Sequence, residues 1–282
     1  MKAPFAYYGG KMGMARLIVS LMPQHRVYLE PFLGSGSVLF VKAPATHEIV
    51  NDVDNSIVSF FRVLRERPED LARVCRLTPH ARTEYLSADL EVEVDDLERA
   101  RRFWIRVNQS FAKTAGKRTG WSVTTARSQS VPASIVNQVS RFDTCAERLR
   151  RVTIECCDGV ALIERLATSD AVIYADPPYL DTSRSPGRGS LGDYRHEMAT
   201  EADHRRLADV LRTTPATVLL SSYPNPLYEE LYRDWCVLDV PVTAFSSNAQ
   251  RKTGRTSRVE RIWSNRAINK ASQSALTFEA AP

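Results

Sequence analysis

The chain has 282 residues, of which 43% are hydrophobic, so its length and composition fit one α/β core plus a modest insertion. Its formal net charge of +5 is only mildly basic, and this total does not by itself indicate a nucleic-acid partner. Five cysteines without a zinc or disulfide pattern, no signal-peptide pattern and no apolar run of about 18 residues argue against a secreted or membrane protein. We therefore expect a cytosolic protein with no membrane partner.

Two glycine-containing turns occur near the start of the chain. Tyr7-Tyr8-Gly9-Gly10-Lys11 predicts a tight turn that opens a helix over residues 12–21. A lysine at a helix start opposes the helix dipole, which indicates a role other than helix stability, but this segment alone favours a solvated lysine beside a turn. An apolar strand from Val27 to Glu30 then leads through Pro31 and Phe32 into Gly34-Ser35-Gly36 and a helix over 37–42.

This second turn has the order of the first strand, turn and helix of an open parallel sheet, where ligands bind beyond the carboxyl ends of strands. It lacks the third glycine of the dinucleotide fingerprint. A second strand ends at Asp52, about 20 residues after the turn, where an acid can hold ribose hydroxyls. Asn51, Asp54 or Asn55 could cap the helix that follows.

Residues 57–150 are predicted to be largely helical, with helices over 57–66, 68–77, 95–108 and 134–150. The stretch 99–127 carries eight arginines and lysines, no acid, and four large aromatic residues. Basic groups neutralise phosphates, while Arg, Asn and Gln pair with base edges, although a solvated surface is the alternative. A second basic stretch covers 250–261.

An alternating pattern of strands and helices resumes at residue 151. Strands are expected at 152–155, 171–175, 218–221, 235–240 and 260–263. A helix is expected over 201–212, with Thr200 and Asp203 spaced as a capping box. Asp158 follows the first of these strands and suits a helix cap.

The most specific motif is Asp176-Pro177-Pro178-Tyr179, directly after the strand at 171–175. Proline has no donor N–H and a fixed φ, so two in succession end the strand and stiffen the turn. The carboxylate and turn carbonyls can accept from an exocyclic amino group while the tyrosine ring stacks on a planar ligand. An ordinary proline-rich turn is the alternative.

This motif resembles the catalytic motif of the amino-methyltransferases that act on DNA bases. The N-terminal segments resemble those of one subgroup, the Dam-like DNA adenine-N6 methyltransferases of the D12 class, which depend on S-adenosylmethionine. The order of cofactor motif, recognition region and Asp-Pro-Pro-Tyr is also similar, over about residues 4–265.

The resemblance implies a Rossmann-like sheet with helices on both faces, plus an inserted, mostly helical target-recognition domain. Residues 1–56 and 151–265 would form the catalytic domain, 57–150 the recognition domain and 266–282 a disordered tail. It implies a catalytic set of Asp176, Pro177, Pro178 and Tyr179. The cofactor-binding set is Tyr7, Lys11, Glu30, Phe32, Gly34, Gly36, Asp52, Asp158 and Asp176, with Phe32 expected to pack locally or toward the substrate. The predicted DNA-binding set is Arg106, Asn108, Gln109, Lys113, Lys117, Arg118, Arg127 and Arg184.

The expected partner is double-stranded DNA, without a metal, and the protein is expected to be a monomer, with a dimer as the alternative. The expected location is the bacterial cytoplasm or nucleoid, or the cytoplasm of a phage-infected cell. A flipped-out adenine would stack on Tyr179, and Asp176 and the Pro177 carbonyl would accept from its amino group. The alternatives are a cytosine-N4 methyltransferase, an inactive DNA-binding relative, and an enzyme acting on RNA or a protein amide. The sequence does not reveal the recognition site.

Overall fold

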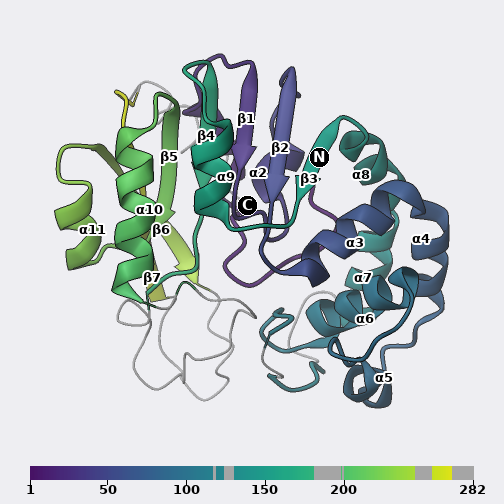
Figure 1. The fold of residues 1–282 in the computed structure, drawn as a ribbon. Helices are drawn as coiled ribbons and strands as arrows, with labels where there is room; N and C mark the ends of the chain where they lie inside the picture. The colour runs from purple at the N-terminus through teal and green to yellow at the C-terminus, as the bar shows by residue number, and fades with distance from the viewer. Residues whose placement is uncertain (117–118, 124–129, 181–197, 199, 245–255, 269–282) are drawn as a thin grey trace.

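The computed structural model describes residues 1–116, 119–123, 130–180, 198, 200–244 and 256–268. In these residues seven strands form one sheet in the order β3-β2-β1-β4-β5-β7-β6 (Figure 1). The strands are β1 (Val27–Glu30), β2 (His47–Asn51), β3 (Val152–Glu155), β4 (Ala171–Ala175), β5 (Thr217–Ser222), β6 (Cys236–Ala244) and β7 (Thr256–Ser264). Strands β1 to β5 pair in parallel, whereas β7 is antiparallel to both β5 and β6.

The helices cover both faces of this sheet. In chain order they are α1 (Ala15–Ser20), α2 (Ser37–Val41), α3 (Asn55–Glu66), α4 (Pro68–Leu77), α5 (Arg82–Ser87), α6 (Asp96–Gln109), α7 (Val131–Val139), α8 (Phe142–Leu149), α9 (Gly159–Leu166), α10 (Glu201–Thr213) and α11 (Pro226–Leu231). Because side chains alternate along a strand, Tyr28 joins the core formed with α1, α2 and α3, while Leu29 joins the core formed with α9, α10 and α11. The expected Rossmann-like fold is confirmed.

The strand order reverses at β1. The chain passes from β1 to β2 and β3 on one side, and then returns to β4 on the other side of β1. The carboxyl ends of β1 and β4 therefore border the crevice in which open α/β sheets bind their ligands.

Helices α3 to α8 lie between β2 and β3 in sequence and gather on one side of the sheet (Figure 1). Phe60 and Phe103, from two of these helices, pack against Phe5 with ring centroids 5.1 and 5.3 Å apart. The helical segment thus shares a core with the N-terminal residues and the sheet. The proposed domain boundaries stay a prediction.

Most of the expected helices and strands are present, but their first and last residues differ from those expected. The strands expected at 218–221, 235–240 and 260–263 are longer in the structure, and the capping box of α10 forms with both of its hydrogen bonds. The continuous helix expected over 134–150 is wrong, because the chain turns at Ser140 and Arg141, whose side chains both donate to the Asn137 carbonyl. Within the described residues, no helix has the length and hydropathy to cross a membrane.

Candidate active site

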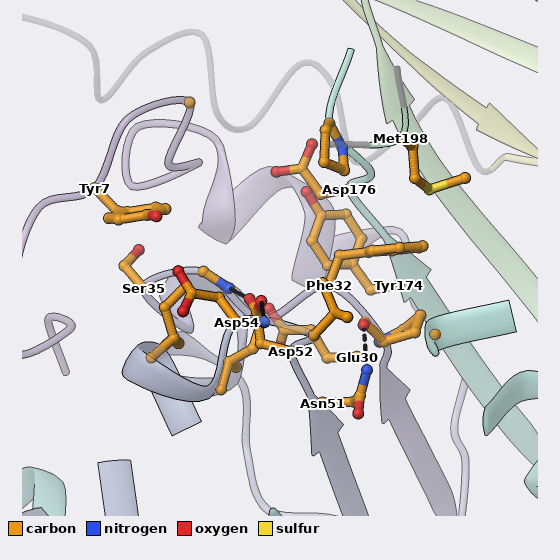
Figure 2. Close-up of a pocket in the computed structure, with 18 of the residues that line it drawn as sticks. Tyr7, Glu30, Phe32, Ser35, Asn51, Asp52, Asp54, Tyr174, Asp176 and Met198 are labelled. Carbon is orange, nitrogen blue, oxygen red and sulfur yellow. Dashed lines mark hydrogen bonds between the residues drawn. The ribbon is translucent and has the colours of Figure 1, made fainter. Parts of the chain in front are cut away.

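A cavity of about 510 Å³ opens at the carboxyl ends of β1, β2 and β4 (Figure 2). Tyr7 lies on one side of it, and Phe32 and Met198 lie on the other. Of the predicted cofactor residues, all except Gly36 line this cavity: Tyr7, Lys11, Glu30, Phe32, Gly34, Asp52, Asp158 and Asp176. The structure thus brings together side chains that come from five separate segments.

The glycine turn and Asp52 are joined directly. Gly34 adopts a φ of 50°, and its N–H donates to Asp52 Oδ2 at 2.9 Å, while the Asp54 N–H donates to Oδ1 at 3.0 Å. Burial raises the pKa of Asp52 to about 7, against the opposing effect of these two hydrogen bonds. Asp54 caps α3 by accepting from the Ser56 N–H, so of the three capping candidates Asp54 is the one confirmed.

Gly36 supports the turn from behind the cavity. Its φ of 68° is in the left-handed region, and an added Cβ would lie 3.2 Å from both Leu33 and Phe40. A glycine is needed here for the turn conformation and the tight packing. Cofactor contact by Gly36 stays a prediction.

The floor of the cavity contains a buried acid and a buried amide. Glu30 accepts from the Tyr28 hydroxyl at 2.8 Å, and burial raises the pKa of Glu30 to about 8. Asn51 is fully buried, donates to the carbonyls of Pro31 and Cys157, and accepts from the Cys157 N–H. Asn51 therefore holds together the loops after β1 and β3, a role that the sequence analysis did not identify.

Asp158 caps a helix at the edge of the cavity, and its contact with the cofactor stays a prediction. It accepts from the Ala161 N–H at 2.8 Å and so caps α9, and it also lines the cavity. Arg206 of α10 donates to both of its oxygens at 2.9 and 3.0 Å, and this guanidinium lowers the pKa of the Asp158 carboxyl.

The Asp-Pro-Pro-Tyr turn follows β4 at the edge of the same cavity. Asp176 Oδ1 lies 2.9 Å from Lys11 Nζ and accepts from the Tyr179 hydroxyl at 3.2 Å. Lys11 is 5% exposed and its Nζ lies 5.0 Å from the centre of the Tyr179 ring, so the alternative of a solvated lysine is wrong. Burial raises the pKa of Asp176, although Lys11 and Tyr179 oppose the rise.

Two further residues meet this turn. Tyr223, after β5, contacts the Tyr179 ring edge-on with centroids 4.7 Å apart. Glu260 of β7 places Oε2 3.8 Å from Lys11 Nζ. No role for Glu260 was evident from the sequence.

The predicted DNA-binding residues that can be placed lie around a hairpin after α6, closed by a bridge between Ser110 and Trp121. Arg106, Asn108 and Gln109 are buried, and each donates to backbone carbonyls of the surrounding chain. Lys113 is half-buried and donates to the Asn108 carbonyl at 2.8 Å. In this structure these side chains donate to the backbone of the hairpin and of the segments around it, and DNA contact by them stays a prediction.

Other predictions fall on residues that the structure does not describe. These are the predicted DNA contacts Lys117, Arg118, Arg127 and Arg184, positions 250–255 of the basic stretch, and positions 269–282 of the predicted tail. Within the described residues, no group of three or more His, Cys, Asp or Glu side chains is placed to hold a metal ion.

A glycine turn after β1, an acid after β2 and an Asp-Pro-Pro-Tyr turn after β4 meet around one cavity, as expected of a Rossmann-like methyltransferase. The model of the D12 class N6 adenine-specific DNA methyltransferases matches residues 7–251, and the chain belongs to this family. The resemblance inferred from the motifs is therefore confirmed.

Individual relatives agree with this family. The chain is 27% identical over 274 residues to the Type II methyltransferase M1.LlaDCHI of Lactococcus lactis subsp. cremoris, covering 91% of this chain and 93% of that protein. It is 25% identical over 244 residues to the DNA adenine methylase of Vibrio cholerae, covering 82% and 85%. It is 27% identical over 240 residues to the DNA N-6-adenine-methyltransferase of Escherichia phage P1, covering 82% of this chain but 31% of that protein.

Proposed function

We propose that this member of the family transfers the methyl group of S-adenosylmethionine to the N6 atom of an adenine flipped out of double-stranded DNA. The observation that carries the proposal is the placement of Asp176, held by Lys11, at the edge of the cavity that contains Asp52. This arrangement puts an acceptor for an amino group beside a site that can hold a nucleoside.

The residues of the cavity fit this cofactor. Asp52 offers two carboxylate oxygens to ribose hydroxyls, and Glu30 places a buried carboxyl group in the lining of the same cavity. Gly10 lets the turn pack closely on Tyr7, since an added Cβ would lie 2.9 Å from the Tyr7 carbonyl, and Gly34 adopts a φ of 50° that favours glycine. When bound, S-adenosylmethionine supplies an electrophilic methyl group on a sulfonium centre.

The Asp-Pro-Pro-Tyr turn would receive the base. Tyr179 presents a ring on which adenine can stack, and Tyr223 braces that ring edge-on. Asp176 and the Pro177 carbonyl would accept from the two N6 hydrogens, which directs the nitrogen lone pair toward the methyl group. Most of the rate enhancement would then come from positioning and electrostatics rather than from covalent catalysis.

The hairpin after α6 is the proposed approach to DNA. Its backbone is tied to the cofactor side, because the Tyr8 N–H donates to the Lys113 carbonyl at 3.0 Å. Phe111 at the start of this hairpin is 44% exposed.

We further propose that the protein acts on chromosomal or phage DNA in the cytoplasm, as a monomer.

The proposal is tested by incubating the protein with tritiated S-adenosylmethionine and unmethylated genomic DNA, and then digesting the DNA to nucleosides. Label in N6-methyladenosine supports it, and sequencing the modified positions supplies the recognition site. Label in N4-methylcytosine would contradict the choice of base but keep the chemistry. No label despite cofactor binding would support an inactive relative or a different nucleic acid.

Cofactor affinity should fall on acidification below pH 7. Because burial raises the pKa of Asp52 to about 7, its carboxylate is increasingly protonated below that pH and cannot accept from both ribose hydroxyls. We expect the Kd of S-adenosylmethionine, measured by calorimetry, to rise by up to about tenfold per pH unit between pH 7 and 5.5.

The matched control is Asp52→Asn, which keeps the shape of the side chain and removes the titration. Its affinity should be weaker at pH 8 and should not change with pH in this way. Glu30, whose pKa is about 8, titrates in both proteins, so the difference between them isolates Asp52. Equal pH profiles for the two proteins would contradict the prediction.

A further inference from the structure

Lys11 lies between two carboxylates rather than beside one. Its Nζ atom is 2.9 Å from Asp176 Oδ1 and 3.8 Å from Glu260 Oε2, and it donates to the Gly9 carbonyl at 2.8 Å. The side chains of Lys11, Asp176 and Glu260 are 4%, 17% and 12% exposed. They come from the N-terminal turn, the turn after β4 and strand β7, which lies between β5 and β6, so the fold assembles this cluster from distant segments.

We propose that Glu260 is a positioning residue for methyl transfer, which acts by sharing the charge of Lys11 and so leaves Asp176 with a net negative charge toward the base. The inference rests on the proposed function of Asp176 as the acceptor for the N6 amino group. Glu260 itself touches neither the base nor the cofactor in this proposal.

The net charge of the cluster accounts for this role. Two ionised carboxylates and one ammonium group have a net charge of −1, whereas Asp176 and Lys11 alone would have none. The amino nitrogen attacks the methyl group, the bond from carbon to sulfur breaks, and the nitrogen becomes cationic until it releases a proton. A net negative charge a few ångströms away stabilises that developing charge in a site with little water.

The surroundings of Glu260 support this role. Among the described residues, its Oε2 atom is buried and makes no hydrogen bond, so Lys11 is the charge it faces. Burial raises the pKa of Glu260, Lys11 opposes the rise, and the negative charge of Asp176 adds to it. The two carboxylates therefore titrate as a coupled pair around one lysine.

Among the residues that the structure describes, the other ionisable groups near the cluster do not supply a second cation. Glu30, Tyr174 and Tyr228 lie close enough to Asp176 to interact with its charge, and Tyr179 and Tyr223 face Lys11. For Lys11, burial alone would lower the pKa, but Asp176 and Glu260 together raise it, so the lysine stays protonated.

The test compares Glu260→Gln with wild type in single-turnover methyl transfer at saturating cofactor and DNA. We expect the rate constant to fall about 10- to 100-fold, because one charge is lost at short range in a buried site. The affinities for S-adenosylmethionine and DNA should stay unchanged. Glu230→Gln, which removes an exposed acid of α11 paired with Arg205, is the matched control and should keep the wild-type rate.

A second measurement reports on Asp176 without turnover. In protein with carbon-13 in its aspartate carboxyl groups, the signal missing from Asp176→Asn identifies Asp176, and its titration gives the pKa. We expect Glu260→Gln to lower this pKa, because Lys11 then pairs with Asp176 alone, and to move the acid limb of the rate profile to lower pH. Glu260→Asp should restore part of both effects.

The results separate this inference from its alternatives. An unchanged pKa of Asp176 in Glu260→Gln overturns the inference, whether the rate falls or not, because a loss of rate alone would reflect a structural role of β7. If Glu260→Gln does not fold, Glu260→Asp is compared with wild type by the same two measurements. The proposed function of Asp176 fails separately, if Asp176→Asn itself keeps the wild-type rate.

Discussion

Asp176→Asn should lower the rate constant for methyl transfer by about 100- to 1,000-fold, in line with the loss of one well-placed group from a preorganised site. The amide keeps the size of the side chain but removes the charge that pairs with Lys11 at 2.9 Å and that would polarise the base. The measurement is single-turnover transfer from tritiated S-adenosylmethionine at saturating cofactor, so that any change in binding does not enter the rate.

The control lies at the opposite end of the same strand. Asp170 precedes β4, is exposed, and accepts from the Thr168 hydroxyl far from the cavity. Asp170→Asn should therefore keep the wild-type rate. A rate for Asp176→Asn close to that of this control would show that the carboxylate takes no part in the chemistry.

The second large effect is on stability, at the other end of β2. The Glu48 side chain is fully buried and pairs with Lys42 at 2.6 Å and with Arg148 of α8, both of which are also buried. Glu48→Gln leaves two buried cations without a counter-charge, and we expect it to lower the free energy of unfolding by about 3–5 kcal/mol. Urea denaturation followed by circular dichroism measures this loss.

The pH dependence of the same network has a defined sign. Burial would raise the pKa of Glu48, but its hydrogen bonds to Arg148 and Lys42 outweigh this effect and lower the pKa below 4.5. The stabilisation is therefore present above about pH 4.5 and is lost as the pH falls through the lowered value. Glu66→Gln, an exposed partner of Arg65, should cost less than about 1 kcal/mol. A similar small loss for Glu48→Gln would contradict the prediction.

The parts of the site that the sequence predicted are those set by local chemistry. A strand followed by Asp-Pro-Pro-Tyr must end in a stiff turn, and Gly34-Ser35-Gly36 must let the backbone turn sharply after β1. Asp52 was predictable because an acid at the end of the second strand of a parallel sheet lies at the ligand edge. Each of these inferences needs only neighbours along the chain and the order of the strands.

The remainder depends on contacts between distant segments. Glu260 lies on the same face of β7 as the buried Ile262. An acid on a buried face of a strand is the one signal in the sequence that could have identified Glu260 as a site residue. The sequence does not show that Lys11 faces this acid. The burial of Arg106 and Gln109 was missed for the same reason. Their composition suggested DNA contact, whereas the closing of the hairpin at Trp121 directs them to backbone carbonyls.

The strand order also constrains when the enzyme can form during synthesis. β6 lies at the edge of the sheet and pairs with β7, which in turn separates it from β5. Residues 256–264 must therefore leave the ribosome before β6 can join the sheet and before Glu260 can reach Lys11. Until then the nascent chain exposes the open edge of β5. A chaperone or a mispaired strand would therefore compete with folding between the synthesis of β5 and that of β7.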